Sequence, residues 1–158
     1  MPVQIHTENA LPFGFEPEFS GNITPSSMEA QYARDNVEGF TTCSDCGVVN
    51  SETNTPILVD CAFAWAAVEE MFNSSVRGGA TIPERSSSLG GCGCHVHMST
   101  RRLLNVKTER EREMFCRESI AYTQRTNRMI SLEGRTEDPI TTEQLRDIII
   151  RMYDQQDI

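Results

Sequence analysis

The sequence has no apolar run of the roughly 18 residues that a membrane-spanning helix requires. Its first residues, Met1 to Glu8, lack the basic and then apolar pattern of a secretory signal. Basic residues are also scarce, because 14 Lys and Arg stand against 23 Asp and Glu and give a net charge of -9. Sequence-independent binding to nucleic acid needs the opposite balance. We therefore expect a cytoplasmic protein with no membrane partner and no nucleic-acid partner.

Cysteine, by contrast, is abundant, with six residues in 158. Without a secretion signal, a disulfide framework is not expected. Cys61 and Cys116 fall within apolar helical patterns and are predicted to be small buried residues. The other four form a C-x-x-C pair and a C-x-C pair: Cys43, Cys46, Cys92 and Cys94. A C-x-x-C pair is typical of structural zinc sites and a C-x-C pair is less usual, and a zinc-stabilised module is one interpretation of the chain.

Two of the three histidines lie in a short stretch, Gly90 to Ser99, that begins with glycine and cysteine. In an extended strand, side chains alternate between the two faces. His95, His97 and Ser99 then share one face, and the residues between them point into packing. This pattern fits a half-buried strand whose histidines face solvent. It equally fits a functional site, provided that acidic partners lie nearby.

A candidate for such partners is the stretch Leu11 to Phe19, where aromatic residues and proline alternate with Gly14, Glu16 and Glu18. As a strand, it places both glutamates on one face, where like charges repel. A divalent cation such as Mg²⁺ or Mn²⁺ relieves that repulsion, because both ions take oxygen ligands. An exposed acidic strand face is the alternative.

Two further segments carry candidate ligands. Glu52 precedes Pro56 and is expected at a strand end or turn, since proline blocks a helix there. Residues 130–135 alternate again and place Glu133 and Arg135 on one face. That pair is either a surface salt pair or a metal ligand beside an arginine that binds phosphate.

Helical periodicity predicts helices at Met28 to Arg34, Leu58 to Asn73 and 108–128, and a last helix that begins near residue 141. Thr108 with Glu111 forms a predicted capping box, and Met114 with Phe115 forms part of an apolar stripe. Residues 74–91 are predicted to form a Ser- and Gly-rich loop. The chain therefore predicts a single α+β domain over residues 1–158, with a loose arm at 1–10, a core at 11–155 and one functional sheet face.

Several of these motifs resemble a known superfamily. Phe13 to Phe19 resembles the E-P-E-F strand of glutamine synthetase, Gly93 to Ser99 its G-x-H-x-H-x-S strand, and Leu132 to Arg135 its E-x-R element. The order of the motifs is most similar to the amidoligase branch of carboxylate–amine ligases, whose members occur in bacteria and their phages. The chain departs from that pattern at Gly134, where an aromatic is usual, in its shortness and in its extra cysteines.

The resemblance implies a twisted, mostly antiparallel sheet with helices on one face, as in a minimal glutamine synthetase catalytic domain. It also implies an activity, in which ATP phosphorylates a small-molecule or peptide carboxylate and an amine displaces phosphate to form an amide. The implied cofactors are ATP and two Mg²⁺ or Mn²⁺ ions. The resemblance does not decide whether the protein is a homo-oligomer in which a neighbouring subunit completes the site.

The same resemblance implies roles for individual residues. The metal ligands are Glu16, Glu18, Glu52, His95 and Glu133. The nucleotide and phosphate contacts are His97, Ser99, Arg101 and Arg135. Within these sets, the residues with an implied catalytic role are Glu18, Glu52 and Arg135. Two alternatives remain: a relative that has lost its chemistry and serves binding or assembly, and the zinc module at Cys43, Cys46, Cys92 and Cys94.

Overall fold

The computed structural model describes residues 12–44, 51–82, 94–98, 108–121, 129–131 and 141–155. The strands are β1 (Phe13–Gly21), β2 (Thr41–Cys43), β3 (Ser51–Asn54), β4 (Ala80–Thr81), β5 (Cys94–Met98) and β6 (Met129–Ser131). The helices are α1 (Pro25–Arg34), α2 (Ala62–Arg77), α3 (Glu109–Ala121) and α4 (Thr142–Gln155). In these ranges no helix has both the length and the apolar character needed to cross a membrane.

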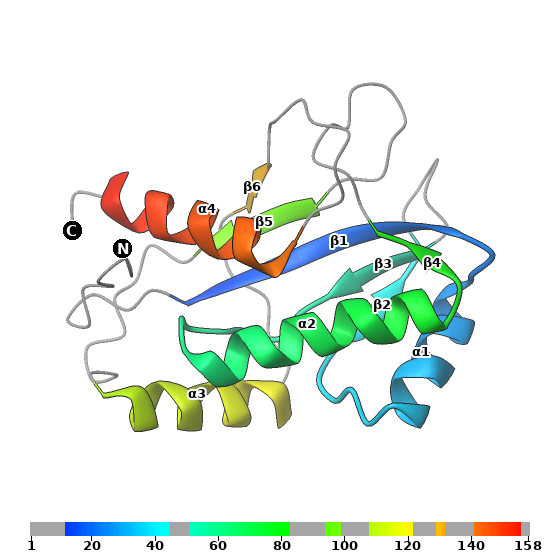
Figure 1. Ribbon diagram of the computed structural model, residues 1–158, viewed down its shortest axis with the longest axis horizontal. Coiled ribbons are helices and arrows are strands. Elements are labelled where there is room, and N and C mark those ends of the chain that lie inside the picture. The colour runs from blue at the N-terminus through cyan, green and yellow to red at the C-terminus, as the bar shows by residue number, and fades with distance from the viewer. Residues whose placement is uncertain are drawn as a thin grey trace.

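The strands form a curled sheet in the order β2-β3-β1-β5-β6, and β4 pairs with the end of β1 (Figure 1). Every pairing in this sheet is antiparallel. The long strand β1 is central, because it pairs with β3, β5 and β4. The α+β class and the antiparallel sheet predicted from the sequence are thus confirmed.

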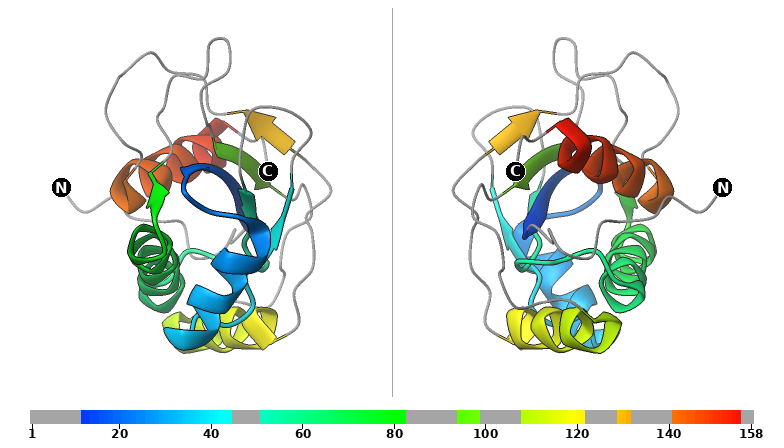
Figure 2. Two further views of the ribbon diagram at one scale, coloured as in Figure 1. Left: turned by 90° about the vertical axis from the view of Figure 1, so that its right-hand side faces the viewer. Right: turned by 90° about the vertical axis from the view of Figure 1, so that its left-hand side faces the viewer.

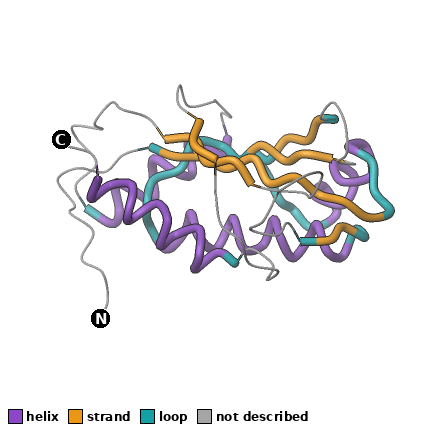
Figure 3. Tube along the Cα trace, turned by 90° about the horizontal axis from the view of Figure 1, so that it is seen from above, coloured by secondary structure: helices purple, strands orange, loops and turns teal. Residues whose placement is uncertain are grey.

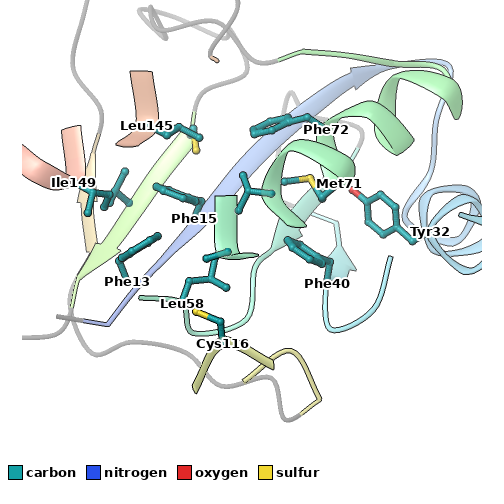
Figure 4. Close-up of a cluster of buried hydrophobic side chains, with 14 of the residues drawn as sticks. Phe13, Phe15, Tyr32, Phe40, Leu58, Met71, Phe72, Cys116, Leu145 and Ile149 are labelled. Carbon is teal, nitrogen blue, oxygen red and sulfur yellow. The ribbon is translucent and has the colours of Figure 1, made fainter. Parts of the chain in front are cut away.

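The hydrophobic core lies between the sheet and the helices (Figure 4). Phe13 and Phe15 of β1 and Val96 of β5 are fully or almost fully buried there. All four helices contribute to the same cluster, with Tyr32, Met71, Cys116 and Leu145 among their members. The helices therefore pack on one face of the sheet. The end-on views show α2, α3 and α4 around the curled sheet (Figure 2), and the view from above shows the long helix α2 running along it (Figure 3). The opposite sheet face carries the polar side chains.

Helix α2 is shifted along the chain relative to its predicted limits. The prediction began at Leu58, but the backbone of Leu58 bonds to Phe13 in both directions at 2.8 Å and so belongs to the sheet. At the other end, the helix continues past Asn73 through residues predicted to be loop. Ser74 and Ser75 are buried within it, and the Ser75 hydroxyl donates to the Met71 carbonyl at 2.8 Å. Tertiary packing here outweighs the loop preference of serine.

Helix α3 begins at the predicted capping box, since the Glu111 amide donates to Thr108 Oγ1 at 3.2 Å and Glu111 Oε2 accepts from the Thr108 amide at 2.8 Å. Its predicted apolar stripe is wrong at Met114, which is 51% exposed. The buried face instead carries Arg112, Cys116 and Ser119. Residues 122–128, also predicted as helix, lie outside the described residues.

Candidate metal site on the polar face of the sheet

The two glutamates of β1 lie on the sheet face away from the helices. Alternation along β1 sends Phe13 and Phe15 into the core and Glu16 and Glu18 to the other side, as predicted. The register places Glu16 opposite His95 of β5 and Glu18 opposite Glu52 of β3. Three neighbouring strands therefore direct acidic and imidazole groups to one place.

Glu16, Glu52 and His95 form the core of this place. Each offers one ligand atom, and these three atoms all lie within 4.8 Å of one another. Glu16 is 8% exposed and Glu52 is 9% exposed, so both carboxylates are largely removed from water. Converging carboxylates at such depth are costly unless positive charge compensates them. A cation between the three groups supplies that charge and is held by the ligand types that Mn²⁺, Zn²⁺ and Mg²⁺ accept.

The two histidines each lie close to a glutamate of β1. His97 Nε2 is 2.9 Å from Glu16 Oε2, and His95 Nδ1 is 4.0 Å from Glu18 Oε1. His97 Nε2 is buried, and among the described residues its contact with Glu16 is not accompanied by a hydrogen bond. A buried polar atom in this position costs free energy, and a cation or ligand bound beside it offsets that cost.

Cys43 and Asn54 belong to the surroundings of this site in a way that the sequence did not reveal. Cys43 is the register partner of Glu52, and its Sγ is 3.5 Å from Glu52 Oε1. Asn54 Nδ2 in turn donates to Cys43 Sγ at 3.4 Å. Glu52 itself was expected at a strand end or turn and lies inside the short strand β3. Side chains two residues apart share a face of a strand, so a strand prediction for residues 51–54 would have placed Asn54 on the same face as Glu52.

Among the described residues, the cysteines of the zinc interpretation are not brought together. The register puts Cys94 opposite Pro17, on the core face, whereas Cys43 is on the face of Glu18 and Glu52. Burial, followed by the negative charge of Glu18, raises the pKa of the Cys94 thiol well above its usual range.

Part of the predicted site falls outside the described residues, namely Cys46, Cys92, Ser99, Arg101, Glu133 and Arg135. The strand that precedes Glu133 is described: β6 ends at Ser131, whose register partner is His95. Of the predicted metal ligands, the structure thus brings together Glu16, Glu52 and His95, with Glu18 next to them.

The chain was also compared with known proteins. No protein family, no curated protein and no solved structure matches it.

Proposed function

We propose that this protein is an ATP-dependent carboxylate–amine ligase that works with a divalent cation. The observation that carries the proposal is the convergence of Glu16, Glu52 and His95, from three strands, within 4.8 Å. The order of the sequence motifs suggests the reaction class, and the polar face of the sheet is the proposed location of the active site.

The donor set fits a divalent cation and favours some ions over others. Two carboxylates suit Mg²⁺ and Mn²⁺, and an imidazole shifts the preference toward Mn²⁺ and Zn²⁺. We therefore expect Mn²⁺ to bind more tightly than Mg²⁺, with Glu16, Glu52 and His95 as ligands. When bound, the cation neutralises phosphate charge, which is a major part of catalysis in phosphoryl transfer.

The proposed reaction has two steps. The γ-phosphoryl group of ATP passes to a carboxylate oxygen of the acceptor and leaves ADP. An amine then attacks the acyl carbon, phosphate departs, and the nitrogen loses a proton. Glu18 lies 4.0 Å from His95 with its side chain 12% exposed, so it is the carboxylate that we assign to receive this proton.

Calorimetry tests the cation and nucleotide part of the proposal. Mn²⁺ is titrated into the metal-free protein, and a non-hydrolysable ATP analogue follows. We expect the analogue to bind only after Mn²⁺, and Glu52→Gln and His95→Gln each to weaken Mn²⁺ binding by about a hundredfold. Glu69→Gln, an exposed glutamate on α2, is the matched control and changes neither titration.

Two results oppose the proposal in different ways. Analogue binding that needs no metal, or that survives both variants, removes the sheet face as the nucleotide site. Stoichiometric Zn²⁺ in the purified protein with no nucleotide binding favours a binding or assembly module. For the ligase step, ADP should form in repeated turnover only when ATP, Mn²⁺, a carboxylate and an amine are all present. A panel of small carboxylates and amines then identifies the substrates.

A further inference from the structure

A second reactive feature lies on the helix side of the sheet, in the contact between α2 and α3. Cys61 immediately precedes α2, Cys116 is in α3, and their sulfur atoms are 3.6 Å apart. Both thiols are free, and both residues are buried. A disulfide needs a sulfur separation of about 2.05 Å, so a small approach of the two helices closes the bond.

Cys116 is held in place by the backbone that leads into α2. Its Sγ accepts from the Val59 amide at 3.2 Å and lies 3.4 Å from the Val59 carbonyl. Cys116 is fully buried, so it is shielded from reagents in solution. It is placed to react with the neighbouring sulfur and with little else.

Cys61 differs because it lines a cleft of about 480 Å³. The other side chains of this lining include one aromatic residue, two acidic residues and two basic residues: Trp65, Asp60, Glu109, Arg112 and Arg146. Cys61 also occupies the N-cap of a helix of 16 residues, where the peptide dipoles favour a thiolate. The hydrogen bond between the two sulfurs lowers the pKa of the Cys61 thiol, and backbone hydrogen bonds from Ala64 and Phe63 lower it further. Burial and the negative charge of Glu109 act in the opposite direction. The contact raises the pKa of Cys116 in turn, and burial adds to the rise.

We propose that Cys61 and Cys116 form a reversible dithiol–disulfide pair, in which Cys61 reacts with hydrogen peroxide that enters the cleft and Cys116 completes the bond. The Cys61 thiolate attacks one peroxide oxygen, the O–O bond breaks, and the leaving hydroxide takes a proton to become water. The product is a sulfenic acid at Cys61. Cys116 then attacks that sulfur and expels a second water, so two thiols and one peroxide give one disulfide and two waters.

Peptide mapping of the full-length protein tests the proposal. The reduced protein is treated with hydrogen peroxide, free thiols are alkylated, and the digest is analysed without reduction. We expect a cross-linked peptide pair containing Cys61 and Cys116, lighter by about 2 Da than the two reduced peptides. Dithiothreitol should restore both thiols. If Cys61 and Cys116 remain alkylated as free thiols while other cysteines oxidise, the proposal is wrong.

Two variants separate the roles of the sulfurs. In Cys116→Ala the sulfenic acid at Cys61 should persist and be trapped by dimedone, whereas Cys61→Ala should give no adduct at Cys116. Equal trapping in both variants, or trapping in neither, overturns the assignment.

Cys94 is an internal control, because it is as buried as Cys61, at 4% exposed each, but it lies on β5 and does not line the cleft. It should stay reduced. Oxidation of Cys94 as fast as that of Cys61 contradicts the argument from the cleft and the helix N-terminus. These measurements need neither ATP nor metal, so they are independent of the proposed ligase function.

Discussion

Replacing Glu52 by glutamine separates a metal-binding role from a structural one. In the metal-free protein, Glu52 and Glu16 place two carboxylates among ligand atoms that lie within 4.8 Å. Glutamine keeps the shape and retains an oxygen that accepts from Cys43, which is 3.5 Å from Glu52 Oε1. The substitution therefore removes like-charge repulsion and preserves packing. We expect Glu52→Gln to stabilise the metal-free protein and to remove most of its stabilisation by metal.

The size of the effect follows from the geometry. Coulomb's law gives about 3 kcal/mol for two unit charges at 4.8 Å with an effective dielectric constant of 20. The neighbouring imidazole and residual solvent reduce this repulsion energy. We therefore expect the free energy of unfolding of the metal-free protein to rise by about 1–2 kcal/mol. For a chain of 158 residues that corresponds to a rise in Tm of about 2–8 °C. Mn²⁺ at a hundred times its Kd should add about 2.7 kcal/mol to the wild type.

Thermal denaturation in EDTA and in excess Mn²⁺ measures both quantities. Wild type should melt below Glu52→Gln in EDTA and above it in Mn²⁺. Glu69→Gln, the exposed control on α2, should follow the wild type in both conditions. If Glu52→Gln melts below the wild type in EDTA and still gains the full Mn²⁺ shift, then Glu52 is a structural residue and the reasoning fails.

Three further predictions concern the scaffold. Tyr32→Phe removes the hydroxyl that contacts Thr53 Oγ1 and Ser75 Oγ at 2.8 Å each, so denaturation by urea should show a loss of about 2 kcal/mol. Hydrogen bonds, first from Ser74, hold the pKa of Asp35 at about 2. Its contribution to stability is therefore complete above about pH 4 and lost as the pH falls toward 2, and the melting temperature of Asp35→Asn should vary less across that window. Gly39→Ala should destabilise strongly, because φ is +79° and a Cβ would lie 2.1 Å from a backbone oxygen of α3, whereas an unchanged unfolding midpoint would contradict the close approach.

Much of the site was predictable because strand alternation is a local property. The pattern around Glu16 and Glu18 and around His95 and His97 fixed which side chains share a face, and the described strands agree. The capping box at Thr108 was likewise predictable, since it depends on residues three apart. The start of α2 was not, because the segment near Leu58 is drawn into the sheet by a partner more than forty residues away in sequence.

The sequence by itself determined the strand patterns, the candidate ligands and the burial of Cys61 and Cys116, because periodicity and side-chain chemistry act over a few residues. Tertiary structure alone decided the order β3-β1-β5, which places Glu52 and His95 on either side of β1. It also decided that Cys43 lies against Glu52 and that Cys61 faces Cys116 across two helices. Register and helix packing arise from contacts between distant segments, and such contacts cannot be derived from local periodicity.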